Sequence, residues 1–216
     1  MAVISIEGAS AAGKTTTSCE LAAKFDGYHI PEVNAWWEPP DSVYPEWFFE
    51  RQVDRWQIAE EKSQNHPFVV IDIDLFQPLW YNWAFDFTLF GGQSLDFVEE
   101  FYRKHLLAKK IGFPDKYYLL STSEKELRSR KEGDRSRRRR GFEMNLRFIE
   151  PQKRYFQEMH SFNPNLVCFI EAVTIEDNVK RILETMPSTA KDHTYSIELL
   201  EFMVSWLRRN KASDFY

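Results

Sequence analysis

The chain has 216 residues, of which 43% are hydrophobic and 28% charged, a composition typical of a globular protein with one well-filled core. Its formal net charge of −5 disfavours a nucleic acid as its partner, and no apolar run is long enough to span a bilayer. Two cysteines without metal-type spacing, and no basic stretch before an apolar one at the N-terminus, predict a cytoplasmic protein with a single domain over residues 1–216.

Short apolar segments alternate with longer amphipathic ones along the chain. We expect β-strands at residues 3–7, 28–33, 68–73, 116–121 and 165–170. We expect helices at residues 15–25, 47–62, 95–110, 175–186 and 196–209, with Phe25 and Leu107 among the inward-facing side chains. This alternation predicts an α/β fold in three layers, a parallel five-stranded sheet between two layers of helices. In such sheets ligands bind beyond the carboxyl ends of the strands.

Residues 8–15 match the phosphate-binding pattern GxxxxGK[ST] at every position, directly after the first predicted strand. Gly8 and Gly13 allow the backbone to approach phosphate oxygens, and the amides that open the following helix point at the anion. Lys14 is expected to reach the β- and γ-phosphates, and the Thr15 hydroxyl to bind Mg²⁺. The segment therefore predicts a site for ATP with Mg²⁺ formed by Gly8, Ala9, Ser10, Ala11, Ala12, Gly13, Lys14, Thr15 and Thr16.

From this loop onward the chain resembles the thymidylate kinases and deoxynucleoside kinases. The similar segments follow one another in the family's order, at residues 6–16, 50–55, 69–72, 118–121, 126–130 and 142–143. The resemblance covers most of residues 2–186 and implies a P-loop kinase fold, with an arginine-rich lid at about residues 128–145 and a further helix at 146–159. Only the phosphate-binding loop is specific by itself. A C-terminal helix at about 190–216 is extra, and it is expected to cover the core or to form a homodimer contact.

Seven arginines lie between residues 128 and 140 of this otherwise acidic chain. Arginine stays charged and matches phosphate geometry, so this cluster favours a lid that closes over the triphosphate. A solvated basic surface, or a patch that binds nucleic acid, is the alternative. We predict catalytic roles for Arg128, Arg135 and Arg137, although Arg138 and Arg139 carry the same chemistry.

Two acidic residues end the third predicted strand. Asp72 follows four uncharged residues and is the predicted magnesium-organising acid, and Asp74 is the alternative if the strand has the other register. The family has an arginine where this chain has Ile73. The chain therefore lacks a cation expected beside a phosphate acceptor, unless Arg51 or Arg55 replaces it.

Glu32 follows the second predicted strand. In the resembled nucleoside kinases an acid at this place takes the proton of the acceptor hydroxyl, a task that a phosphate acceptor does not require. Six of the seven tryptophans lie between residues 36 and 83, and Trp36, Trp37, Trp56 or Trp80 could stack on a base that Gln52 or Gln57 recognises. The predicted substrate-binding residues are Glu32, Trp36, Arg51, Gln52, Arg55 and Trp56.

Together these motifs predict an ATP- and Mg²⁺-dependent phosphotransferase that moves the γ-phosphoryl group to a nucleoside or a nucleoside monophosphate. The first alternative is a kinase of antibiotic or other small hydroxyl compounds, similar to the chloramphenicol phosphotransferases. A nucleotide switch is a second alternative, although the chain has no Asn-Lys-x-Asp guanine signature. An enzyme that phosphorylates nucleic acid is a third, and it depends on residues 137–140 alone.

Overall fold

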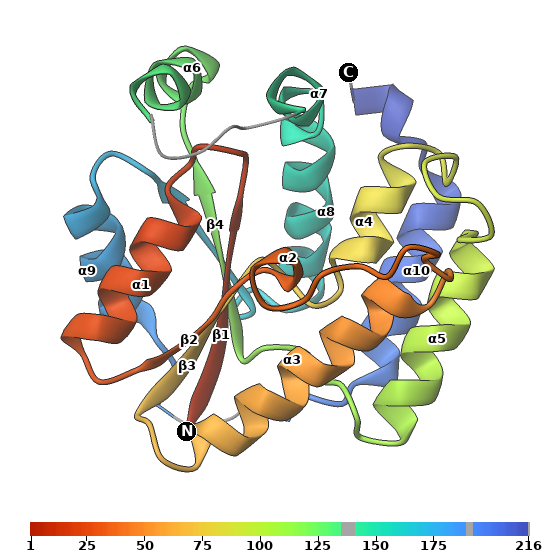
Figure 1. Cartoon of the computed structure of the whole chain (residues 1–216), viewed down its shortest axis with the longest axis horizontal. Coiled ribbons are helices and arrows are strands. Elements are labelled where there is room, and N and C mark those ends of the chain that lie inside the picture. The colour runs from red at the N-terminus through yellow and green to blue at the C-terminus, as the bar shows by residue number, and fades with distance from the viewer. Residues whose placement is uncertain (135–140, 189–191, 216) are drawn as a thin grey trace.

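The computed structural model describes residues 1–134, 141–188 and 192–215, and its centre is a five-stranded sheet (Figure 1). The strands are β1 (Ala2–Gly8), β2 (Tyr28–Ile30), β3 (Phe68–Asp72), β4 (Lys116–Ser121) and β5 (Val167–Glu171). Their order is β2-β3-β1-β4-β5, and every neighbouring pair is parallel. The predicted parallel five-stranded α/β fold is therefore confirmed. The central strand β1 is buried along its whole length and ends in the phosphate-binding loop.

Successive strand residues point to opposite sides of the sheet, so both of its faces carry apolar side chains. Helices cover both faces and bury these side chains. Ile4, Val70 and Tyr118 belong to the core beneath α1 (Lys14–Lys24) and α9 (Ile175–Thr185). Val69 and Tyr117, one residue away along their strands, belong to the larger core on the other face. That core is completed by α3 (Trp47–Ser63), α5 (Leu95–Leu107), α8 (Ile149–Phe162) and α10 (Ile197–Arg209). None of the helices in the described part of the chain is both long enough and apolar enough to cross a membrane.

Several local predictions were wrong. Strand β2 ends at Ile30, because Pro31 has no N–H to continue the ladder and Glu32 already caps α2 (Val33–Trp36). Phe25 follows the last turn of α1 and is 42% exposed. On α5 the buried residues Val98, Tyr102 and Leu106 recur every four positions, so Leu107 lies about 100° away around the helix and is 68% exposed.

Four further helical elements belong to the described part of the chain. They are α4 (Gln77–Trp83), α6 (Glu124–Gly133), α7 (Phe142–Leu146) and the 3-10 turn η1 (Ala212–Phe215). Helix α4 was not predicted. Its seven residues include Pro78 in the first turn, and Leu79, Trp80 and Trp83 are buried, so it is stabilised by packing more than by helix propensity.

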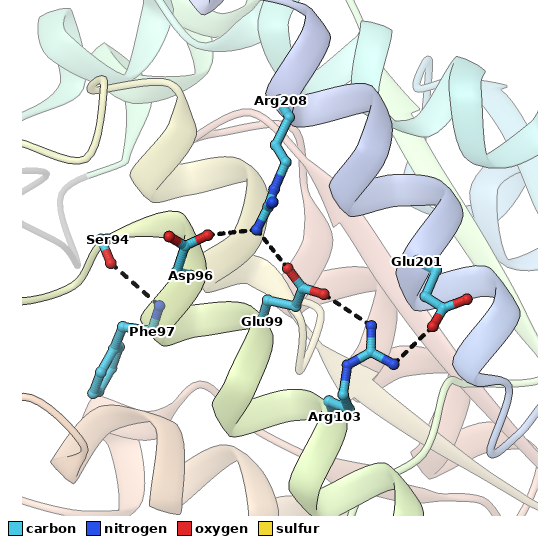
Figure 2. Close-up of polar contacts among 7 residues, drawn as sticks. All are labelled: Ser94, Asp96, Phe97, Glu99, Arg103, Glu201 and Arg208. Atoms are coloured by element: carbon cyan, nitrogen blue, oxygen red, sulfur yellow. Dashed lines mark hydrogen bonds and ion pairs between the residues drawn. The ribbon is translucent and has the colours of Figure 1, made fainter.

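The C-terminal helix α10 covers the core of its own chain. Leu200, Met203 and Val204 are fully or almost fully buried where it packs against α5 and α8. Figure 2 shows the polar border of this contact, in which Arg208 bonds Asp96 and Glu99, and Arg103 bonds Glu99 and Glu201. The figure also shows Ser94 capping α5 through the Phe97 N–H. The first of the two expectations for this helix is thus met, and a homodimer stays a prediction.

Candidate active site

The phosphate-binding loop joins β1 to α1 in the conformation that its glycines allow. Gly8 has a φ of 141°, and a β-carbon there would lie 2.3 Å from the Leu120 carbonyl oxygen, which excludes any side chain. Gly13 has a φ of 101° and caps α1 in the left-handed region. The Lys14 Nζ donates to the carbonyl oxygens of Gly8 (2.9 Å) and Ala9 (3.2 Å), so the ammonium lies across the loop.

A cavity of about 630 Å³, which we call the phosphate cavity after the predicted role of the loop, lies over this loop. Eight of the nine residues predicted to hold ATP line it, and the ninth, Ala12, is 1% exposed in the core. The other walls come from the ends of β1 to β3 and from α4, α7 and α8. These further lining residues are Glu7, Glu32, Asn34, Ile73, Gln77, Trp80, Tyr81, Asp134, Asn145, Phe148, Ile149 and Gln152.

A second cavity, of about 390 Å³, lies beside the first and has mainly apolar walls. We call it the acceptor cavity. It is lined from α3 by Trp47, Phe48, Gln52 and Arg55, and from the loop at 85–93 by Phe90 and Gln93. The two cavities share five lining residues: Glu32, Asn34, Ile73, Gln77 and Tyr81. Glu32 therefore lies at the junction between the polar cavity over the loop and the apolar acceptor cavity.

A buried polar cluster supports the loop from below. Glu7 is 1% exposed and accepts hydrogen bonds from the Gln152 Nε2 (2.8 Å) and from the Asp74 backbone N–H. Burial, with Asp74 as the second cause, raises the pKa of Glu7 to about 8. Burial also raises the pKa of Asp74, which is 0% exposed, to about 7. Sequence reasoning missed Glu7, although a carboxylate one residue before the loop's first glycine was a visible signal.

Not all of the residues predicted to bind Mg²⁺ line the phosphate cavity. Thr15 lines the phosphate cavity, whereas neither Asp72 nor Asp74 does. Both carboxylate oxygens of Asp72 are buried and have no hydrogen-bond partner within the described residues, and Oδ2 is 4.0 Å from the His29 Nε2. No group of three or more metal-type side chains occurs in the part of the chain that the structure describes. A hydroxyl with one or two carboxylates still suits Mg²⁺, which takes its other ligands from phosphates and water.

Helix α3 contributes two of its predicted substrate residues to the acceptor cavity, Gln52 and Arg55, which are 0% and 1% exposed. The Arg55 Nη2 donates to the carbonyl oxygens of Asp72 (2.5 Å) and Ile73 (3.0 Å), so the guanidinium caps the end of β3. Burial lowers the pKa of Arg55 to about 10, which leaves it charged at neutral pH.

Of the other predicted substrate residues, Glu32 lines both cavities, whereas Trp36, Arg51 and Trp56 line neither of them. Arg51 pairs with Asp54 (2.6 Å) and lies against the Trp37 and Trp47 rings. Trp56 is 2% exposed in the core, edge-on to Tyr195, and Trp36 is 39% exposed at the surface. Gln57 is exposed. Of the tryptophans that could stack, Trp80 lines the phosphate cavity, and Trp47, which was not proposed, lines the acceptor cavity.

The described part of the predicted lid includes two arginines, both on α6. Arg128 is held in ion pairs with Glu124 (2.6 Å) and Glu143 (2.7 Å) and does not line the phosphate cavity. Arg130 instead reaches the loop, donating to the carbonyl oxygens of Ala12 (3.3 Å) and Ala172 (2.8 Å). The remaining candidates Arg135, Arg137, Arg138 and Arg139 lie outside the described residues, so their catalytic roles stay predictions.

Comparison with known proteins agrees with this architecture. No protein-family model matches the sequence, and no curated protein matches it. Among solved structures, the chain is similar to deoxyadenosine kinase from M. mycoides with bound dATP (TM-score 0.56, 17% identity, 86% of this chain and 99% of that one). The same enzyme with products dCMP and a flexible dCDP gives a TM-score of 0.53 at 17% identity, over 87% of this chain and 100% of that one.

A third similar structure is a thymidylate kinase, the other group of enzymes that the sequence resembles. Thymidylate kinase from Candida albicans has a TM-score of 0.55 and 16% identity, over 85% of this chain and 89% of that one. At such identities the likeness establishes the path of the backbone and not the substrate. The chain therefore has the fold of the P-loop nucleoside and nucleotide kinases.

Proposed function

We propose that this chain transfers the γ-phosphoryl group of ATP to a hydroxyl group of a nucleoside. The observation that carries the proposal is the position of Glu32, which lines both the phosphate cavity and the acceptor cavity. A general base must lie within hydrogen-bond reach of the attacking hydroxyl, and that hydroxyl must itself face the transferred phosphoryl group. A carboxylate at the junction of the two cavities meets that requirement.

The chain's own groups supply the rest of the chemistry by positioning and charge. The amides of the phosphate-binding loop and the Lys14 ammonium would hold the phosphates in line with the acceptor. Thr15 and a carboxylate, either the predicted Asp72 or the cavity-lining Glu7, would hold Mg²⁺, which neutralises the charge that develops on the phosphates. Glu32 would take the proton of the hydroxyl as the new bond to phosphorus forms.

A nucleoside suits the acceptor cavity better than a nucleoside monophosphate. Among the described residues that line it, Arg55 is the one cation. Its guanidinium is already committed to Gln52 and to the carbonyl oxygens at the end of β3. An acceptor phosphate would bring about two negative charges to a cavity with no uncommitted cation in its described walls, a costly transfer from water. A neutral hydroxyl compound avoids this cost.

The apolar walls of the acceptor cavity also fit a second candidate function, phosphorylation of another small hydroxyl compound such as an antibiotic. Val43, Tyr44 and Phe90 line the acceptor cavity and are 44–56% exposed at its mouth. An acceptor with an apolar body would bury them. Both candidates use Glu32 in the same way, so the chemistry of transfer does not separate them.

The test is ADP release from ATP and Mg²⁺ with each natural nucleoside, each nucleoside monophosphate and a set of hydroxylated antibiotics, beside a reaction without acceptor. The proposal predicts stimulation by at least one nucleoside and none by the monophosphates. Stimulation by monophosphates alone would contradict it. Stimulation by an antibiotic alone would favour the second candidate.

A further inference from the structure

Gln52 and Arg55 stand one helical turn apart on α3 and meet inside the acceptor cavity wall. The Arg55 Nη1 donates to the Gln52 Oε1 at 2.6 Å, and both side chains are almost completely buried. The other end of the guanidinium is attached to the carbonyl oxygens of Asp72 and Ile73. Arg55 is therefore held at two places, on its own helix and on the end of β3, and cannot turn without breaking both.

This contact fixes which way the Gln52 amide faces. A guanidinium only donates hydrogen bonds, so the amide oxygen must point toward Arg55 and the amide nitrogen away from it. The Gln52 Nε2 is buried and has no hydrogen-bond partner within the described residues. By contrast, both amide atoms of Gln93 on the same cavity are satisfied, by Asn82 (2.9 Å) and by the Pro45 carbonyl (2.9 Å). A buried donor without a partner costs free energy, which a ligand that accepts its hydrogen bond would recover.

From this geometry we infer that Gln52 reads the acceptor only as a hydrogen-bond donor, with Arg55 as the positioning residue that prevents the amide from turning over. The inference rests on the proposed function, because it assigns the acceptor cavity to a nucleoside. A free glutamine offers a donor and an acceptor together and can pair with either pattern on a base edge. The locked amide favours a base that places a carbonyl oxygen or an unprotonated ring nitrogen against it, and it rejects an N–H at that place.

The substitution Gln52→Glu tests this reading, because it exchanges the donor for an acceptor while adding one negative charge beside Arg55. Glutamate has the same shape, and one of its oxygens still accepts from Arg55. The other oxygen replaces the amide nitrogen, so the donor becomes an acceptor. Gln57→Glu is the matched control, since it adds the same charge to an exposed position of the same helix that lines neither cavity. Thermal unfolding of each variant checks that the fold is retained.

The readout is the dissociation constant of nucleoside pairs, measured by calorimetric titration without ATP. Adenosine with inosine, and cytidine with uridine, exchange a donor for an acceptor at the same ring positions. For at least one pair we expect a preference of about 10-fold in the wild type, as one satisfied or unsatisfied buried hydrogen bond gives. Gln52→Glu should reverse that preference and Gln57→Glu should keep it. Equal preference in the wild type and in Gln52→Glu would overturn the inference.

The role of Arg55 is tested separately. Arg55→Lys keeps a group that only donates, so the wild-type ranking of each pair should persist even if all affinities fall. Arg55→Met releases the amide, and the preference within each pair should fall to about 2-fold or less. If Arg55→Met does not fold, the reversal in Gln52→Glu decides alone. Nucleosides that bind with the expected ranking but are never phosphorylated would overturn the proposed function and leave this inference standing, whereas a wild type that binds none of them would overturn both.

Discussion

The backbone N–H of Asp74 donates to the Glu7 carboxylate and so joins the ends of the neighbouring strands β3 and β1 beneath the phosphate-binding loop. Both acidic side chains are buried, and the pKa values are raised to about 8 for Glu7 and about 7 for Asp74. In the unfolded chain both acids titrate near pH 4. The folded protein therefore keeps protons that the unfolded chain releases.

This difference predicts that the ligand-free protein loses stability as the pH rises. For an acid whose pKa is raised by folding, no stability is lost below the unfolded pKa, and the loss grows until the pH passes the folded pKa. The free energy of unfolding should therefore fall by about 6 kcal/mol between about pH 5 and about pH 8, with slightly more than half of the loss due to Glu7. Urea denaturation at several pH values, with a chelator present, measures it.

The control for this prediction is Glu7→Gln, which removes one of the two titrating groups. Because its amide has one acceptor oxygen fewer, the variant is expected to be less stable at low pH. The slope against pH is the informative quantity, and it should be about half that of the wild type. Parallel curves for the two proteins would show that Glu7 is ionised in the folded state.

Gly8→Ala should destabilise the protein strongly. An added β-carbon would lie 2.3 Å from the Leu120 carbonyl oxygen at a φ of 141°, so the central pair β1–β4 would have to move. A loss of about 3 kcal/mol or more in the free energy of unfolding is expected. Gly91→Ala is the matched control, because nothing lies within 4 Å of its added carbon, and it should change stability by less than about 0.5 kcal/mol. Equal effects of the two substitutions would contradict the close approach of Gly8 to Leu120.

Substitutions at two neighbouring residues of α10 distinguish the contribution of apolar packing to stability from that of surface ion pairs. Leu200 is completely buried, and its replacement by alanine should cost about 2–5 kcal/mol. Glu201 belongs to the exposed network of Figure 2, and its replacement by alanine should cost less than about 1 kcal/mol. Chemical denaturation of both variants measures the ratio. A larger loss for Glu201 would show that the ion pairs, and not the core, hold this helix.

Lys14→Ala should abolish turnover without unfolding the chain. Within the described residues, the Nζ donates only to the loop carbonyl oxygens of Gly8 and Ala9, so the fold depends little on it. Loss of a preorganised charge beside the transferred group is expected to lower kcat by about 100-fold or more. Steady-state kinetics and thermal unfolding should be measured on the same sample. Undiminished kcat in the folded variant would rule out the loop as the catalytic phosphate site.

The sequence predicted the central strands well, because β1 and β3 are buried on both faces and therefore appear as nearly continuous apolar runs, as at residues 68–71. It failed where packing overrides local preference. Helix α4 is short and contains Pro78, and only the burial of its apolar residues makes it a helix. The glycine-rich loop, by contrast with α4, was predictable from the sequence, because its backbone conformation requires those residue types.

The acceptor side could be predicted only in part, because the helical period shows which residues share a face but not what that face touches. Gln52 and Arg55 line the acceptor cavity as expected, yet Trp56, the very next residue, turns into the core. Local sequence does not reveal that Arg55 reaches the carbonyl oxygens at the end of β3, from 17 and 18 positions away along the chain. For the same reason, the pairing of Glu7 with Asp74 was not visible before the strands were placed side by side.

The most direct test of the central claim follows the γ-phosphoryl group itself, with ATP radiolabelled on that phosphate, a nucleoside and Mg²⁺. We predict labelled nucleoside monophosphate with the wild type, and formation about 100-fold slower with Glu32→Gln, which keeps the shape of the side chain but cannot accept the proton. Label that passes only to a monophosphate acceptor or to water, or equal rates for the two proteins, would contradict this mechanism.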